Sequence, residues 1–274
     1  MTRALLIVLL SCFGGATHLA AQGVKYRRTP GDTLRYRELG TSNVTLTAQD
    51  GAAPVMTRQA ATIALTFHSQ DSVEAWYDEL MVEASDPNGF HRPDPAAVLP
   101  QSFILRFGEH GDIETMATPV FPAEFQEVTD LTQQFLDFFP HLPKQGALTV
   151  GRSWRDTTTY GDTTDLGQYF RVRRNMRFEV TGDTVLAGRT ARVIALREEL
   201  HIEIGGPVRG QPLDTEGVLD GWETGYFIFD QENGVLLGRR REGELTGPLV
   251  FTGDQEPFRV GRRIRYTNLI EVLR

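Results

Sequence analysis

The chain of 274 residues contains a single cysteine, Cys12, so it cannot form a disulfide within itself. It also lacks cysteines and histidines at the spacing of a zinc site. Neither a Gly-Lys-Ser/Thr phosphate loop nor a Gly-x-Ser-x-Gly nucleophile turn is present. Because no nucleophile, base and orienting group can be assembled from the sequence, we predict that the protein is not an enzyme and uses no metal or cofactor.

Basic residues are also fewer than acidic residues. The chain carries 28 basic and 36 acidic residues, a formal net charge of −8 at pH 7. A chain this acidic is a poor match for a phosphate backbone, so we predict no nucleic-acid partner.

Long apolar runs are absent except near the N-terminus. Arg3 precedes an apolar run at 4–10, and small residues follow at Ala20-Ala21-Gln22. This three-part pattern is typical of a signal peptide, so we assign residues 1–22 as a removed leader, cleaved near Ala21 or Gln22. The run is too short to cross a bilayer, and we predict no transmembrane segment in the mature chain. We expect a periplasmic or outer-envelope location, and we disfavour lipidation at Cys12 because the apolar region before it is short.

Most of the remaining chain alternates apolar and polar residues with the period of two that is typical of strands. We predict a single, mainly β domain over 23–274, built as a long, curved antiparallel sheet that forms an unclosed barrel or two packed sheets. A short echo between 31–35 and 151–155 suggests two similar β halves, 23–120 and 150–274, joined by the segment 121–149.

One row of arginines follows the strand period. Between 170 and 180 the even positions are apolar, with Arg174 as the exception. The odd positions include Arg171, Arg173 and Arg177, and Arg263 and Arg265 repeat the pattern near the C-terminus. We predict a solvated outer sheet face for these five residues, and contact with an anion or a lipid headgroup is the alternative.

The segment 122–139 shows a helical period instead. Pro122 suits a first helical position, and Pro140 would end the helix. Its apolar residues fall mostly on one stripe, so we predict an amphipathic helix that covers the apolar face of the sheet. The helix either closes a packed core or forms a lid over an apolar cavity. In the second case the ligand-binding residues are Phe125, Val128, Leu131, Phe135, Phe138 and Phe139.

Four stretches carry a resemblance to known proteins: PGDTLRYR, LPKQGALTVGRSWRDT, VTGDTVLAGRTARVI and YFIFDQENGVLL. Together they resemble a group of uncharacterised exported bacterial proteins. The layout of long strands with one covering helix is similar to that of periplasmic lipoprotein carriers and mycobacterial lipid-binding lipoproteins. This second resemblance implies an unclosed barrel around a hydrophobic cavity, and no binding residue can be carried across from it.

These observations lead to two hypotheses. In the first, the protein is a non-catalytic exported envelope protein that binds or carries a hydrophobic, lipid-like ligand under the helix. The alternative is an envelope interaction or scaffold module with a packed core, whose partners are other envelope proteins. An apolar cavity of roughly 300 Å³ or more would favour the first hypothesis.

Overall fold

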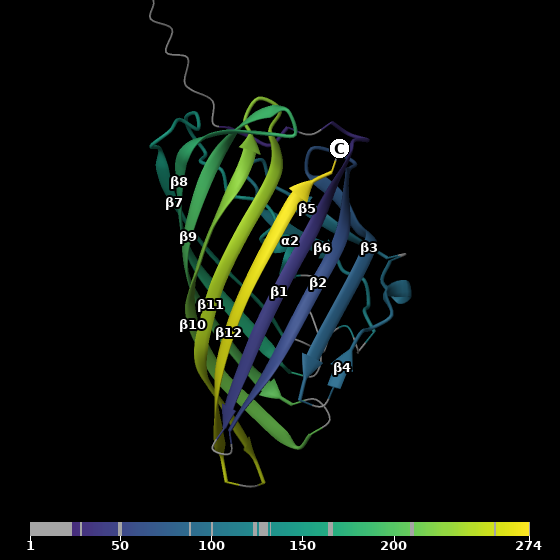
Figure 1. The fold of residues 1–274 in the computed structure, drawn as a ribbon, viewed down its shortest axis with the longest axis vertical. Helices are drawn as coiled ribbons and strands as arrows, with labels where there is room; N and C mark the ends of the chain where they lie inside the picture. The colour runs from purple at the N-terminus through teal and green to yellow at the C-terminus, as the bar shows by residue number, and fades with distance from the viewer. Residues whose placement is uncertain are drawn as a thin grey trace, which may run out of the picture.

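The computed structural model describes residues 24–27, 29–48, 51–87, 89–99, 101–122, 125, 131, 133–163, 167–208, 211–254 and 256–273. The predicted leader, 1–22, therefore lies outside the described residues. The fold is mainly β, as predicted, and its strands form one antiparallel sheet (Figure 1). The strands are β1 (Thr33–Ala48), β2 (Gly51–Phe67), β3 (Ser72–Asp86), β4 (Gly89–His91), β5 (Ser102–Phe107), β6 (Ile113–Ala117), β7 (Ser153–Thr163), β8 (Tyr169–Leu186), β9 (Arg189–Pro207), β10 (Leu213–Asp230), β11 (Val235–Gly253) and β12 (Phe258–Val272).

The sheet has the order β6-β5-β3-β2-β1-β12-β11-β10-β9-β8-β7, and β4 pairs with β3 outside this path. Most neighbours are consecutive in the chain, which suits antiparallel strands joined by tight turns. Two pairs are exceptions: β3 pairs with β5, and β1 pairs with β12 over a long register that runs from Tyr36 opposite Val272 to Thr47 opposite Gly261. Strands from the two ends of the chain thus lie at the centre of the sheet, and β6 and β7 form its edges.

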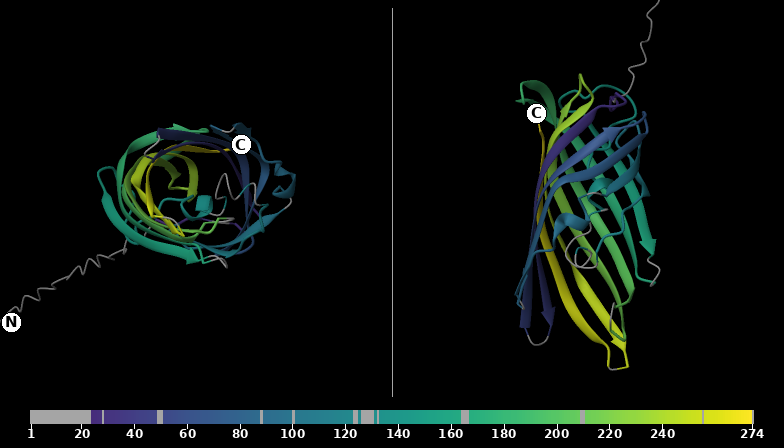
Figure 2. Two further views of the ribbon diagram at one scale, coloured as in Figure 1. Left: turned by 90° about the horizontal axis from the view of Figure 1, so that it is seen from below. Right: turned by 90° about the vertical axis from the view of Figure 1, so that its right-hand side faces the viewer.

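The sheet curls around a central space but does not close, because no ladder joins β6 to β7 among the described residues (Figure 2). Strand twist favours curling, and glycines that face inward on β10 and β11 allow a sharper bend. A Cβ at Gly243 would lie 2.6 Å from the ring of Tyr266 on β12, so a larger residue there would displace that ring. The predicted unclosed sheet is therefore confirmed, as a single sheet.

The outer face of the sheet is highly charged. Arg171, Arg173 and Arg177 on β8 are exposed, while their neighbours in the strand point inward and are buried. On β12, both Arg263 and Arg265 donate to Glu244, at 2.9 and 2.8 Å. The prediction that this arginine row forms a solvated outer face is confirmed.

The segment that links β6 to β7 passes through the inside of the curled sheet. It contains the four-residue helix α2 (Gln133–Leu136), which Figure 2 shows within the ring of strands. Phe135 of α2 packs against Phe103 of β5, with ring centroids 4.6 Å apart. Phe138 packs against Tyr36 of β1 at 5.1 Å. The linking segment therefore fills part of the concave side and belongs to the core.

The predicted amphipathic helix over 122–139 is not supported. The helix α2 covers only Gln133–Leu136, and the chain then turns, with the Phe138 N–H donating to the Phe135 carbonyl oxygen. Phe125 is helical, but most of 123–132 lies outside the described residues. The physical reason is that the segment is buried on several sides. Phe138 and Phe139 are adjacent in the chain and both buried, at 1% and 6% exposed, whereas adjacent residues of a surface helix point in different directions and are not usually both buried. A segment surrounded by sheet can therefore bury its apolar residues without the single apolar stripe of a surface helix.

Candidate functional site

The concave face changes its chemistry along the strands. At one end lies an aromatic layer, defined as Tyr26, Tyr36, Phe107, Phe138, Phe139 and Phe229, whose rings contact one another at centroid distances of 4.6 to 6.5 Å. Next comes a charged layer, defined as Glu38, Asp137, Arg174, Glu198, Glu223, Arg239 and Arg241. The far end holds an open cavity. The inward residues of β1 follow the same order. Strand alternation points Tyr36, Glu38, Val44 and Leu46 inward, and along the strand they contribute in turn to the aromatic layer, the charged layer and the open cavity.

The predicted lid residues are placed in and around the aromatic end. Phe125, Leu131, Phe135, Phe138 and Phe139 are all buried in one cluster with the inward side chains of the sheet. Val128 lies outside the described residues. The structure thus brings five of the six predicted residues together against the concave face. Their contact with a ligand stays a prediction.

The charged layer is organised around two buried ion pairs. Arg174 on β8 forms a bidentate pair with Glu198 on β9, with Nη2 2.7 Å from Oε2, and it also pairs with Asp137 of the linking segment. Arg241 on β11 pairs with Glu223 on β10 and lies 3.5 Å from Glu198. Buried charges persist when they are paired and hydrogen-bonded in this way.

Glu38 and Arg239 extend this layer across β1, β11 and β12. Glu38 accepts hydrogen bonds from Asn268 at 2.6 Å and from Gln59 at 3.1 Å. Arg239 donates to Asn268 at 2.5 Å and to the backbone carbonyl of Asp137. Arg241 donates to the same carbonyl at 3.1 Å. The charged layer therefore anchors the linking segment to the sheet.

Burial controls the ionisation of these groups. Burial raises the pKa of Glu38, although Arg239 opposes the effect. Burial and the neighbouring Arg241 lower the pKa of Arg239 to about 9. Burial also acts to lower the pKa of Arg241, but the carboxylates of Glu223 and Glu198 outweigh it, so the pKa of Arg241 rises. Arg239 and Arg241 therefore remain charged at neutral pH, and the charged layer forms a polar partition between the aromatic layer and the open cavity.

A smaller cavity lies beside this partition. Its volume is about 340 Å³, and Glu38, Glu223, Arg239 and Arg241 line one part of it. Asp137, Tyr266 and Asn268 add further polar groups, and the apolar part of its wall comes from Tyr160, Val172, Leu200, Ile202 and Leu245.

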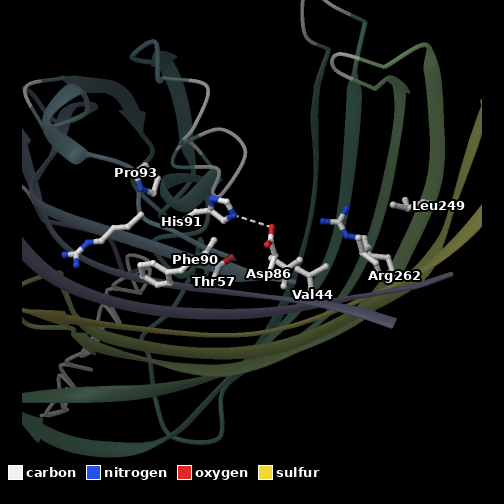
Figure 3. Close-up of a pocket in the computed structure, with 12 residues that line it drawn as sticks. Val44, Thr57, Asp86, Phe90, His91, Pro93, Leu249 and Arg262 are labelled. Carbon is white, nitrogen blue, oxygen red and sulfur yellow. Dashed lines mark ion pairs between the residues drawn. The ribbon is translucent and has the colours of Figure 1, made fainter. Parts of the chain in front are cut away.

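The open cavity at the far end has a volume of about 760 Å³ (Figure 3). Its volume lies within the range of roughly 300–1,000 Å³ that is usual for small-molecule sites. On one side, the Asp86 carboxylate lies 3.5 Å from His91 and accepts from the Gly89 N–H at 3.0 Å. On the other side, the Arg262 side chain points toward the space (Figure 3). The apolar lining comes from Val44, Leu46, Val55, Ala84, Phe90, Pro93 and Leu249.

Arg262 differs from the other inward arginines in the bonds of its terminal nitrogens. The Nε of Arg262, like that of Arg239, is buried without a hydrogen-bond partner in the part of the chain that the structure describes. Arg239 donates through its two terminal nitrogens to Asn268 and to the Asp137 carbonyl, and no such bond of Arg262 is found among the described residues. Burial lowers the pKa of Arg262. This guanidinium is thus partly removed from water without the protein partners that Arg174 and Arg241 possess.

A third cluster lies at the seam between the sheet edges. His141 Nδ1 is 2.6 Å from a carboxylate oxygen of Asp156 on β7 and 4.0 Å from one of Asp112, which precedes β6. The hydrogen bond from His141 lowers the pKa of Asp156. The Trp154 Nε1–H donates to the His141 carbonyl at 2.8 Å. Potential ligand atoms of these three residues lie within 4.8 Å of one another, and the short contact to Asp156 makes the cluster a link across the seam.

The inward charges were not predicted from the sequence, although the alternation of apolar and polar residues indicated their positions. Arg174 was the exception in an otherwise apolar row, and Arg262 has the same parity as the apolar Ile264 and Tyr266. An ionisable residue at an apolar position of a strand indicates a buried pair or a ligand contact. The pairing partners were not predictable, because Glu198 and Glu223 come from strands whose register the sequence does not show.

Comparisons with known proteins do not assign a family. No protein-family model matches the sequence, and no curated protein matches it. One similar solved structure is OccK2 (OpdF) of Pseudomonas aeruginosa in complex with glucuronate, with 7% identity, a TM-score of 0.24, and coverage of 92% of this chain and 99% of that chain. Another is OmpF of Salmonella typhi in complex with daunomycin, with 8% identity, a TM-score of 0.22, and coverage of 91% and 100%. Scores this low do not establish a common fold, and nothing in these comparisons supports the resemblance to lipoprotein carriers.

Among the described residues, no helix is long and apolar enough to cross a membrane.

Proposed function

We propose that the protein is an exported, non-catalytic binding protein or carrier for a lipid-like ligand, which it holds in the open cavity of its concave face. The observation that carries this proposal is the 760 Å³ cavity, whose apolar wall comes from β1, β2, β3 and β11. The leader-like segment at 1–22 supports the exported location.

The aromatic layer, together with Phe125, Leu131 and Phe135, packs the opposite end of the interior. With the charged layer, they divide the concave face into a packed part and an open part. Packing at one end gives the fold a core, and the open end keeps apolar side chains such as Val44 and Leu46 only half-buried. A hydrophobic guest would remove this surface from water, at about 25 cal/mol per Å² of apolar area.

Titration with the neutral fluorescent probe N-phenyl-1-naphthylamine tests the proposal. The wild-type protein is expected to bind the probe saturably with enhanced emission. Val55→Glu places a carboxylate in the apolar wall and is expected to weaken binding by tenfold or more, because the probe cannot compensate the charge. Met56→Glu is the matched control, since Met56 is the next residue of β2 and is 42% exposed on the outer face.

The outcomes separate the two hypotheses. Saturable binding that Val55→Glu weakens and Met56→Glu leaves unchanged supports a ligand in the cavity. The absence of saturable binding by the wild-type protein would overturn the proposal and favour the scaffold module. Equal weakening in both variants would place the probe outside the cavity.

A further inference from the structure

Arg262 occupies an unusual position on β12. It points inward, and its register neighbours are Leu46 on β1 and Gly247 on β11. Neither neighbour offers a charge or a side-chain acceptor. Among the described residues its guanidinium forms no ion pair, and its Nε is buried without a hydrogen-bond partner in that part of the chain. A guanidinium in this environment has lost part of its hydration without protein compensation.

Two of the other inward arginines are paired with carboxylates. Arg174 has Glu198 and Asp137, and Arg241 has Glu223. These pairs belong to the charged layer and fix the linking segment. Arg262 lies beyond that layer, at the open cavity, where a molecule from solution can reach its guanidinium (Figure 3).

The rest of the cavity decides what kind of molecule suits this position. Val44, Leu46, Val55 and Leu249 provide an apolar surface on the same concave face as Arg262. The acidic group of the cavity, Asp86, is engaged by His91 and by the Gly89 N–H. The site therefore combines one cationic group that lacks a protein partner with a broad apolar wall.

We propose that the cavity selects an amphipathic anion: a single-chain lipid whose carboxylate, sulfate or phosphate monoester binds the Arg262 guanidinium while its chain lies on the apolar wall. An anionic oxygen supplies the acceptor that the guanidinium lacks, and charge-assisted hydrogen bonds are about twice as strong as neutral ones. This inference rests on the proposed function for the apolar part of the ligand, and it adds the identity of the headgroup and of the residue that recognises it.

A set of amphiphiles with the same twelve-carbon chain tests the headgroup. Laurate, dodecyl maltoside and dodecyltrimethylammonium are each used below their micelle concentrations at pH 8 to displace N-phenyl-1-naphthylamine from the wild-type protein. Laurate is expected to bind about tenfold more tightly than the neutral maltoside and more tightly still than the cation. Inorganic phosphate alone is expected to displace no probe, because it has no chain.

Variants of adjacent residues connect the preference to Arg262. Arg262→Gln is expected to lower laurate affinity about tenfold and to leave dodecyl maltoside affinity unchanged. Arg262→Lys is expected to retain part of the preference for laurate, because it keeps the charge without the planar fork. Arg263→Gln is the matched control, since Arg263 faces outward and pairs with Glu244, and it is expected to behave as wild type.

The experiment distinguishes failure of this inference from failure of the proposed function. Saturable binding of probe and maltoside with no preference for laurate overturns the headgroup assignment and leaves a lipid-binding cavity. Equal loss of laurate and maltoside in Arg262→Gln also overturns it. No saturable binding of any apolar probe overturns both proposals. Phosphate that binds as tightly as laurate would replace the amphiphile by a simple anion and overturn the present inference.

Discussion

Adjacent arginines on β8 have opposite environments. Arg173 is exposed on the outer face, whereas Arg174 is 4% exposed and paired with Glu198 and Asp137. Arg174→Gln removes the charge that compensates two carboxylates, so we expect the free energy of unfolding to fall by about 3–5 kcal/mol. The measurement is denaturant unfolding at neutral pH, in which the free energy of unfolding of the two proteins is compared at the same dependence on denaturant concentration.

Arg173→Gln provides the comparison within the same strand. We expect its free energy of unfolding to stay within about 0.5 kcal/mol of wild type, because Arg173 is solvated on the outer face. Similar small effects of both substitutions would show that the charged layer is hydrated and not a buried network. A large effect of Arg173→Gln would show that the outer face of β8 is covered.

The two residues also show what the sequence reveals at this scale. Alternation separates inward from outward positions, and it correctly assigned Arg171, Arg173 and Arg177 to the outside. The same rule, applied to Arg174, gives an inward position that was not predicted, and alternation cannot name the partner that makes burial tolerable. That partner depends on register, because Arg174 lies opposite Leu200 on β9 while Glu198 lies opposite Met176. A diagonal contact of this kind is a property of the assembled sheet.

At the scale of elements, the linking segment behaves as a core component. Phe135 is 1% exposed and contacts Phe103 and Tyr77, with centroid distances of 4.6 and 6.1 Å. We expect Phe135→Ala to lower the free energy of unfolding by about 3–5 kcal/mol, the usual range for emptying a buried aromatic site. Thermal or denaturant unfolding of the purified variant measures this loss.

Phe90→Ala is the control for this prediction, since Phe90 is 63% exposed and lines the open cavity. We expect a change in stability below about 0.5 kcal/mol. Should Phe135→Ala cost little and instead shift the affinity for an apolar probe, the linking segment would be a lid over the ligand, as the sequence pattern suggested.

The same segment explains why the predicted helix failed while the predicted strands succeeded. A strand in a curled sheet has one inner and one outer face, so a period of two appears directly in the sequence. The linking segment is surrounded by strands, and its apolar residues reflect burial on several sides. The apolar content of the segment indicated its place on the concave face. The long helix that its spacing predicted is not supported, since the described residues contain only α2 and the helical Phe125.

At the scale of the whole molecule, the pairing of β1 with β12 determines the architecture. It brings the two ends of the described chain into one ladder, so the strands before and after the linking segment form a single sheet. The sequence predicted an antiparallel, curved, unclosed sheet from its alternation and turns. It did not predict this central ladder, because a contact between residues more than 200 positions apart leaves no local signal. The open cavity includes side chains from both sides of this ladder. The candidate site therefore could not be predicted from the sequence either, because it depends on the same long-range pairing.

Export is the prediction that concerns the molecule as a whole. Arg3, the apolar run at 4–10 and the small residues at Ala20-Ala21-Gln22 indicate a cleaved leader. We expect protein recovered from the envelope fraction to begin near Gln22 or Gly23, as measured by N-terminal sequencing and intact mass. Val24 and Tyr26, close to the start of the described residues, are buried in the core, so the expected cleavage near Gln22 leaves both of them in the mature chain. An intact Met1 would contradict export, and a lipid-modified Cys12 would show that the chain is anchored to a membrane through a longer N-terminal segment.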